Sequence, residues 1–135
     1  MLNAFDAADR TRVEVIPCFG REDLPGLLQR HGVFLFPSPA EGCSLAMLEA
    51  MAGGLVPVLS RTGYAMDLIE PGRNGLLAAA GDVDGFAEAV LAVAGDPEAA
   101  RRMGRSARES MAGHSWRERA AERTRIWDAL PGEAA

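Results

Sequence analysis

Three short apolar runs in the first half of the chain constrain its fold most. They are residues 33–36 (VFLF), 55–59 (LVPVL) and 75–79 (GLLAA). A strand that is apolar at every position is typical of a parallel sheet covered on both faces, because a half-exposed strand would alternate. Patterns of helical type separate the runs, at residues 22–30, 44–52 and 64–69. This alternation implies right-handed crossovers between parallel strands.

One more strand is predicted at residues 12–17 (RVEVIP), which alternate and end at proline. Residues 1–80 are therefore expected to form a Rossmann-like α/β layer with a parallel sheet of about four strands. Asp82 is a good N-cap, and the pattern after it is helical, with breaks at residues 95–97 and 113–115. We expect residues 81–130 to form a C-terminal helical tail, and we treat residues 1–135 as one unit.

Charge and composition exclude several classes of function. The chain has 135 residues and a net charge of −5, and its 14 basic residues are all arginines. An acidic domain without a basic stripe is a poor candidate for nucleic-acid binding. No apolar run approaches the roughly 20 residues that span a bilayer. Cys18 and Cys43 are far apart and form no CxxC pair, so we expect no metal site and two free thiols in a reducing cytoplasm.

The loop over residues 37–43 and the helix after it carry the chemistry. In an open parallel sheet, ligands bind beyond the carboxyl ends of the strands, and this loop leaves such an end. Ser44 is a plausible N-cap, so the first amides of the following helix are free to bind an anion. Gly42 removes a side chain where a ligand would approach. A diphosphate would suit this position, although the chain has neither a Walker loop nor a GxGxxG motif.

Two carboxylates accompany this anion site. Glu49 interrupts a helix that is otherwise apolar nearly all round and so is expected to be buried. It either accepts hydrogen bonds from ligand hydroxyls, or lies on an exposed strip or bonds to a backbone amide. Glu41 lies in the loop, beyond the expected N-terminus of the helix. Paired carboxylates also occur in glycosidases, but an anion site with two carboxylates better fits a charged, hydroxyl-rich ligand such as a nucleotide sugar.

The run PSPAEGCSLAMLEAMAGGLVPVLS at residues 37–60 resembles the E-x7-E signature of retaining glycosyltransferases of the GT-B fold, particularly family 4. The likeness continues through a glycine loop at Gly63, an acidic residue at Asp67 and the N-G-L strand that begins at Asn74. The last helices resemble those of the family too. Three positions depart from its pattern, which usually has an aromatic at Cys43, a glycine at Ser44 and a glutamate at Asp67.

The resemblance implies roles for individual residues. Glu41 would lie against the transferred sugar at the reacting centre, and Glu49 would bind the ribose of the donor. Gly42 and the amides of Cys43, Ser44 and Leu45 would face the sugar and the diphosphate. Such enzymes stabilise the departing diphosphate electrostatically, and GT-B members usually need no metal. The donor is a nucleotide-diphosphate sugar, and no other cofactor is expected.

Length limits what the resemblance implies. The chain is similar only to the later part of the donor-binding domain, and the acceptor domain is not in it. Also missing is the unit that in the family carries an Arg and a Lys that bind the diphosphate. The chain has no lysine at all. Because only half of the active-site cleft is present, we do not expect the chain to be catalytic by itself. Two alternatives therefore stay open: a donor-binding module that works with an acceptor-domain polypeptide, and a remnant that only associates. We expect a cytoplasmic protein, with peripheral attachment to the inner membrane through a partner domain as the alternative.

Overall fold

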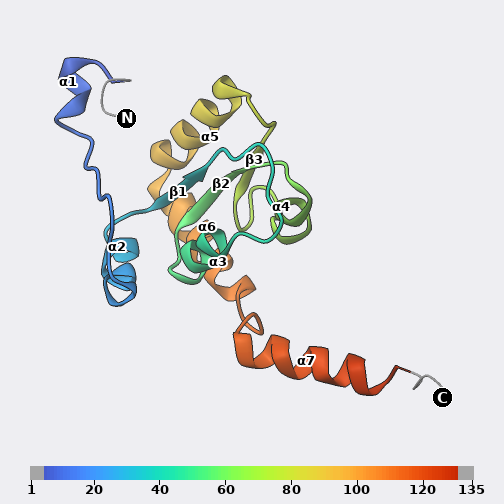
Figure 1. Cartoon of the computed structure of the whole chain (residues 1–135). Helices are drawn as coiled ribbons and strands as arrows, with labels where there is room; N and C mark the ends of the chain where they lie inside the picture. Colours follow the sequence, from blue (N-terminus) through green and yellow to red (C-terminus); the bar gives the residue numbers. More distant parts are fainter. Residues whose placement is uncertain (1–4, 131–135) are drawn as a thin grey trace.

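The computed structural model describes residues 5–130 and shows a three-stranded parallel sheet. The predictions for the chain ends, residues 1–4 and 131–135, lie outside the described part. The strands are β1 (Val33–Phe36), β2 (Val56–Ser60) and β3 (Leu76–Ala78), in the order β1-β2-β3 (Figure 1). Val33 pairs with Val56, and Val58 pairs with Leu76. The predicted α/β class and the parallel sheet are confirmed.

The strand predicted at residues 12–17 is not formed. These residues run between α1 (Ala7–Arg10) and α2 (Leu24–Gln29) without a ladder partner, and Val15 and Ile16 are exposed (Figure 1). A strand exists only where a neighbour completes its hydrogen bonds, and none of residues 5–130 does so here. The sheet therefore has three strands instead of about four.

Helices cover both faces of the sheet. Besides α1 and α2, they are a 3₁₀ turn η2 (Arg21–Asp23), α3 (Leu45–Ala52), α4 (Gly63–Leu68), α5 (Val83–Gly95), α6 (Pro97–Ser110) and α7 (Trp116–Asp128). Leu59 packs with α3, α4 and α6, whereas its neighbour Val58 packs with Phe86 of α5. Successive side chains of a strand point to opposite faces, so β2 serves both halves of the core. Every residue of β2 is buried, as its apolar sequence predicts.

The helix ends follow the predicted capping residues. Ser44 accepts a hydrogen bond from the Met47 amide at the start of α3, and Asp82 accepts one from the Gly85 amide at the start of α5. Each side chain satisfies one of the free donors of a first turn. Gly53 ends α3, which is the stop that the Gly-Gly pair predicts.

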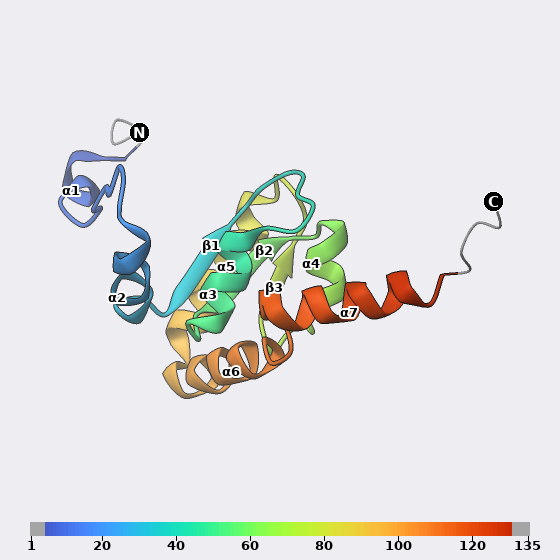
Figure 2. The same cartoon turned by 60° about the horizontal axis from the view of Figure 1, so that its bottom comes forward.

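The last helix stands away from the body of the molecule. Figure 2 shows α7 projecting past α4, and none of its residues is buried. Trp116 is 74% exposed and Trp127 is 76% exposed. A helix of this length is marginal alone in water, because helices of this size take most of their stability from packing. The exposed tryptophans therefore mark a face that lacks its packing partner within the described part of the chain. No helix among residues 5–130 is long and apolar enough to cross a membrane.

Candidate functional site

The candidate site lies where β1 and β2 end, at the carboxyl edge of the sheet. Phe36 ends β1 opposite Leu59, and the chain then leaves the sheet as an irregular loop that enters α3. The Ser44 Oγ accepts from the Met47 amide over 3.5 Å, which sets the start of α3. The amides before Met47 in the first turn have no partner inside the helix, so the positive end of α3 faces this edge.

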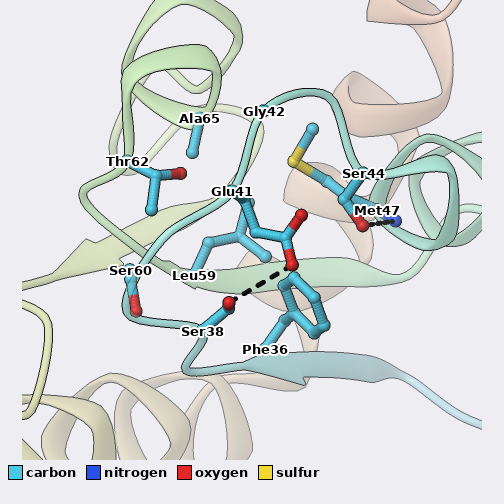
Figure 3. A pocket seen from close by; sticks show the side chains of 10 residues that line it. All are labelled: Phe36, Ser38, Glu41, Gly42, Ser44, Met47, Leu59, Ser60, Thr62 and Ala65. Carbon is cyan, nitrogen blue, oxygen red and sulfur yellow. Dashed lines mark hydrogen bonds between the residues drawn. The ribbon is translucent and has the colours of Figure 1, made fainter.

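A pocket opens at this edge, and its lining comes from two strand ends, the loop and two helices (Figure 3). The residues that line it are Phe36, Ser38, Glu41, Gly42, Ser44, Met47, Leu59, Ser60, Thr62 and Ala65. Its floor is apolar where Phe36 and Leu59 meet, and its walls carry three further hydroxyl groups besides that of Ser44. The structure therefore brings together Glu41, Gly42 and Ser44, three of the predicted site residues.

Glu41 is held by a neighbouring hydroxyl. The Ser38 Oγ donates to Glu41 Oε1 over 3.2 Å and also lies 3.1 Å from the Ala40 carbonyl oxygen (Figure 3). Glu41 itself is exposed, and no cationic side chain lines the pocket with it. Its carboxylate therefore points into the pocket with free lone pairs, in a position to accept hydrogen bonds or to stabilise positive charge.

The other predicted residues do not line this pocket. Leu45 is 52% exposed at the start of α3, and Glu49 is exposed one turn further along the same helix. The helix is not buried all round as expected: α3 packs its face of Met47 and Met51 on the sheet and leaves the opposite face open. Of the alternatives for Glu49, the structure therefore shows the exposed strip. The argument from a costly buried carboxylate therefore does not apply to Glu49, and its part in ligand binding stays a prediction.

Cys43 stands beside Tyr64 of α4. Burial raises the pKa of the Tyr64 hydroxyl, and the neighbouring Cys43 thiol raises it further. The Tyr64 hydroxyl is protonated at neutral pH with or without this shift, and it can donate a hydrogen bond beside Cys43. Cys43 is exposed and not disulfide-bonded, as is Cys18.

Sequence reasoning missed Ser60 and Thr62 as site residues. Ser60 is the last residue of β2 and Thr62 precedes α4, so both stand at the carboxyl edge. Their signal was present, since polar residues that directly follow a buried apolar run mark the strand end where ligands bind. Within residues 5–130, no group of three or more His, Cys, Asp or Glu side chains is placed to hold a metal ion.

The pocket is shallow for a large ligand. Its enclosed space is only about 10 Å³, about that of one water molecule, whereas sites that enclose a drug-sized molecule hold about 300 to 1,000 Å³. A sugar or a nucleotide therefore does not fit inside it with the loop as it stands, and would lie at its open mouth. The arrangement offers an anion-binding helix end, several hydroxyls and one carboxylate.

The comparisons with known proteins point to one family. Residues 8–110 match the family described as glycosyl transferases group 1. The chain is 36% identical over 93 residues to N-acetyl-alpha-D-glucosaminyl L-malate synthase of Bacillus anthracis, which covers 68% of this chain and 24% of that protein. It is 38% identical over 89 residues to glycogen synthase of Mycobacterium tuberculosis (strain H37Rv), with 66% of this chain and 22% of that protein covered.

Solved structures agree with the family. Sucrose-phosphate synthase from Thermosynechococcus elongatus superposes with a TM-score of 0.81 at 28% identity, over 87% of this chain and 30% of that chain. Anabaena HepE in complex with UDP superposes with a TM-score of 0.75 at 22% identity, over 82% of this chain and 31% of that chain, and supports the fold alone. The chain spans about a quarter of the length of the curated relatives it matches.

Proposed function

Because this chain belongs to the group 1 family of glycosyl transferases, we propose that it carries the donor-binding half of a retaining, family 4-like glycosyltransferase. The reaction would transfer a sugar from a nucleotide-diphosphate sugar to an acceptor. The observation that supports this most is the pocket at the carboxyl edge of the sheet, where Glu41, Gly42 and Ser44 meet the free amides of α3.

The charge distribution of the site fits a leaving diphosphate. The first-turn amides and the dipole of α3 stabilise negative charge, and Gly42 places no side chain before them. Charge on the diphosphate grows as the glycosidic bond breaks, so donors fixed at this point act more strongly on the transition state than on the ground state. No step of this proposal uses a metal ion.

The two glutamates of the E-x7-E pattern take separate roles in the proposal. Glu41 faces the pocket and would lie against the sugar that becomes positively charged, while the acceptor attacks the face that the diphosphate leaves. Glu49 lies on the open face of α3 and would accept hydrogen bonds from the ribose hydroxyls. The backbone amides of Cys43 and Leu45 would also donate hydrogen bonds to the diphosphate.

The rest of the cleft would come from residues outside this chain. The pocket is too small to enclose a nucleotide sugar, and the open face of α3 leaves Glu49 and Leu45 in solvent. An acceptor domain and the remainder of the donor domain would cover these surfaces, either in one longer polypeptide or in a partner chain. The cytoplasm supplies nucleotide sugars and keeps the free thiols reduced, so we place the reaction there, with attachment to the inner membrane through the partner domain as the alternative.

A second candidate is a non-catalytic donor-binding module, or a remnant that needs a partner for any activity. The open edge of β1, where Leu35 is 50% exposed, favours it for the chain on its own. The transferase half and the donor-binding module share the donor site and differ in whether transfer follows, whereas a remnant that only associates would bind no donor. Binding therefore tests the part that the first two have in common.

The test is calorimetry of the 135-residue chain with a panel of nucleoside diphosphates and their sugars. We expect binding of at least one sugar nucleotide, and a loss of about tenfold in affinity for Glu49→Ala, which corresponds to one charge-assisted hydrogen bond. Glu88→Ala is the matched control, because Glu88 is also an exposed helical glutamate, on α5 and away from the site. Equal affinities for all three proteins would refute the role of Glu49, and no binding to any panel member would refute donor binding by this chain.

A further inference from the structure

One buried hydroxyl has no partner. Ser60 is 2% exposed, and its Oγ makes no hydrogen bond within the part of the chain that the structure describes. A buried hydroxyl without a partner destabilises a fold, and such groups are rare in native structures. Asn74, the other buried polar residue among residues 5–130, bonds to the Glu70 amide, the Leu68 carbonyl and the Ser110 hydroxyl. Ser60 thus departs from the rule that buried polar groups are hydrogen-bonded, and a ligand that supplies the missing partner would explain why.

The unpartnered hydroxyl belongs to the pocket. Ser60 ends β2, and its side chain is one of those that line the pocket, together with Ser38 and Glu41 (Figure 3). The loop that lines the pocket with it is irregular and mostly exposed, and the Ser38 hydroxyl braces it by a hydrogen bond to Glu41 or to the Ala40 carbonyl. Ser60 is nearly fully buried, so a ligand would reach its hydroxyl only with a movement of this loop.

The surroundings of Ser60 fit a neutral, hydroxyl-bearing group. Ser38, Ser60 and Thr62 contribute hydroxyls and Glu41 a carboxylate, and none of the ten residues that line the pocket is cationic. A carboxylate repels a phosphate, so the anion belongs at the other end, before α3. A serine hydroxyl both donates and accepts, which matches a sugar hydroxyl.

We propose that Ser60 is a specificity residue whose hydroxyl bonds a hydroxyl of the sugar carried by the donor. The inference rests on the proposed function, because it assigns one end of the same pocket to the sugar. Ser60 would have no direct contact with the nucleotide. The unpartnered hydroxyl lowers the stability of the free protein, and a hydroxyl of the bound sugar supplies the missing hydrogen-bond partner.

The first arm of the test needs no ligand. Ser60→Ala removes a hydroxyl that has no partner, so its melting temperature should equal or exceed that of the wild type. Ser110→Ala is the matched control, because the Ser110 Oγ donates to the Ala107 carbonyl over 2.7 Å and accepts from Asn74. Its melting temperature should fall by about 3 °C or more. A comparable fall for Ser60→Ala would overturn the proposal, since the hydroxyl would then be bonded within the fold.

The second arm compares ligands that differ only in the sugar. Calorimetry with UDP and UDP-glucose, and then with the corresponding guanosine and adenosine pairs, identifies the pair that the wild type binds. Ser60→Ala should weaken the sugar nucleotide about three- to tenfold and change the affinity for the free nucleoside diphosphate less than twofold. Equal losses for both ligands, or no loss for either, would overturn the assignment to the sugar.

The two arms separate this proposal from the proposed function. If the wild type binds no member of any pair, donor binding by this chain is refuted, and the assignment of Ser60 to the donor's sugar is refuted with it. If the wild type binds a pair and Ser60→Ala keeps its affinity for the sugar nucleotide, the proposed function stands and only the assignment of Ser60 is overturned. A fall in stability removes the inference whatever the ligands do.

Discussion

A close contact between two glycines is one of the points at which α6 packs against the site-bearing part of the fold. A Cβ atom added to Gly104 would lie closer than 3.0 Å to the carbonyl oxygen of Gly54, and near 4.0 Å from a methyl group of Val56. Gly54 lies in the turn that joins α3 to β2, with φ +83, and Gly104 lies in α6. The backbone of α6 therefore touches the backbone that leads from the candidate donor helix into the central strand.

Gly104→Ala should destabilise the fold in spite of a better helix propensity. Alanine favours a helix over glycine by about 1 kcal/mol. Overpacking of a buried site costs about 1 to 3 kcal/mol and sometimes more, and a clash with a backbone oxygen cannot be relieved by rotating a side chain. The upper part of that range applies, so the net loss is about 2 kcal/mol. For a domain of this size that corresponds to a fall in melting temperature of roughly 6 to 10 °C.

Thermal and urea unfolding followed by circular dichroism measure this effect. Gly95→Ala is the control, because Gly95 is also helical and a Cβ there meets nothing within 4 Å. It should leave stability unchanged or raise it by up to about 1 kcal/mol. If Gly104→Ala is as stable as Gly95→Ala, then α6 does not approach Gly54 as described, and the packing argument is refuted.

Three further predictions concern single residues. Asn74→Ala leaves the Glu70 amide and the Leu68 carbonyl without their buried partner, so urea unfolding should show a loss of about 2 kcal/mol; an unchanged midpoint would contradict it. Hydrogen bonds from Ser115 lower the pKa of Glu118, so this carboxylate stabilises α7 at neutral pH and the contribution is lost as the pH falls through the lowered pKa. The helical signal should therefore fall on acidification in the wild type, whereas Glu118→Gln should show less of this dependence. In any complete enzyme that contains this segment, Glu41→Ala should abolish sugar transfer and leave the unfolding curve intact; retained turnover would refute the catalytic role of Glu41.

Local sequence signals predicted the parts of the fold that depend on local chemistry. Each all-apolar run became a strand of the parallel sheet, buried throughout in β2 and at least half-buried in β1 and β3 apart from the exposed Leu35, because only a covered parallel sheet accommodates such residues on both faces. Ser44 and Asp82 cap their helices, since a cap needs only the amides two or three residues ahead. The candidate loop could be placed because strand ends and helix starts are readable from the sequence.

The features that the sequence did not reveal depend on distant neighbours. Residues 12–17 alternate like a strand, but alternation says nothing about whether a neighbouring strand is there to pair with them. Glu49 sits among apolar residues, yet the face it occupies is open because no layer among residues 5–130 covers it. The unpartnered hydroxyl of Ser60 and the contact between Gly54 and Gly104 arise from segments far apart in the chain. These features depend on packing between segments that are far apart in the sequence, and local sequence patterns do not report such packing.

The size of the native polypeptide decides between the two forms of the proposed function. The chain buries its sheet on both faces, but the edge of β1, the open face of α3 and both tryptophans of α7 remain in solvent. Large exposed apolar surfaces in a stable protein are normally covered by another domain or chain. We therefore expect an antibody to this region to detect a species well above 14.3 kDa in the source cells, as a two-domain transferase requires. A species of 14.3 kDa alone would contradict that expectation. The acceptor half would then have to come from a separate polypeptide, which should co-purify with the chain and restore transfer when added to it.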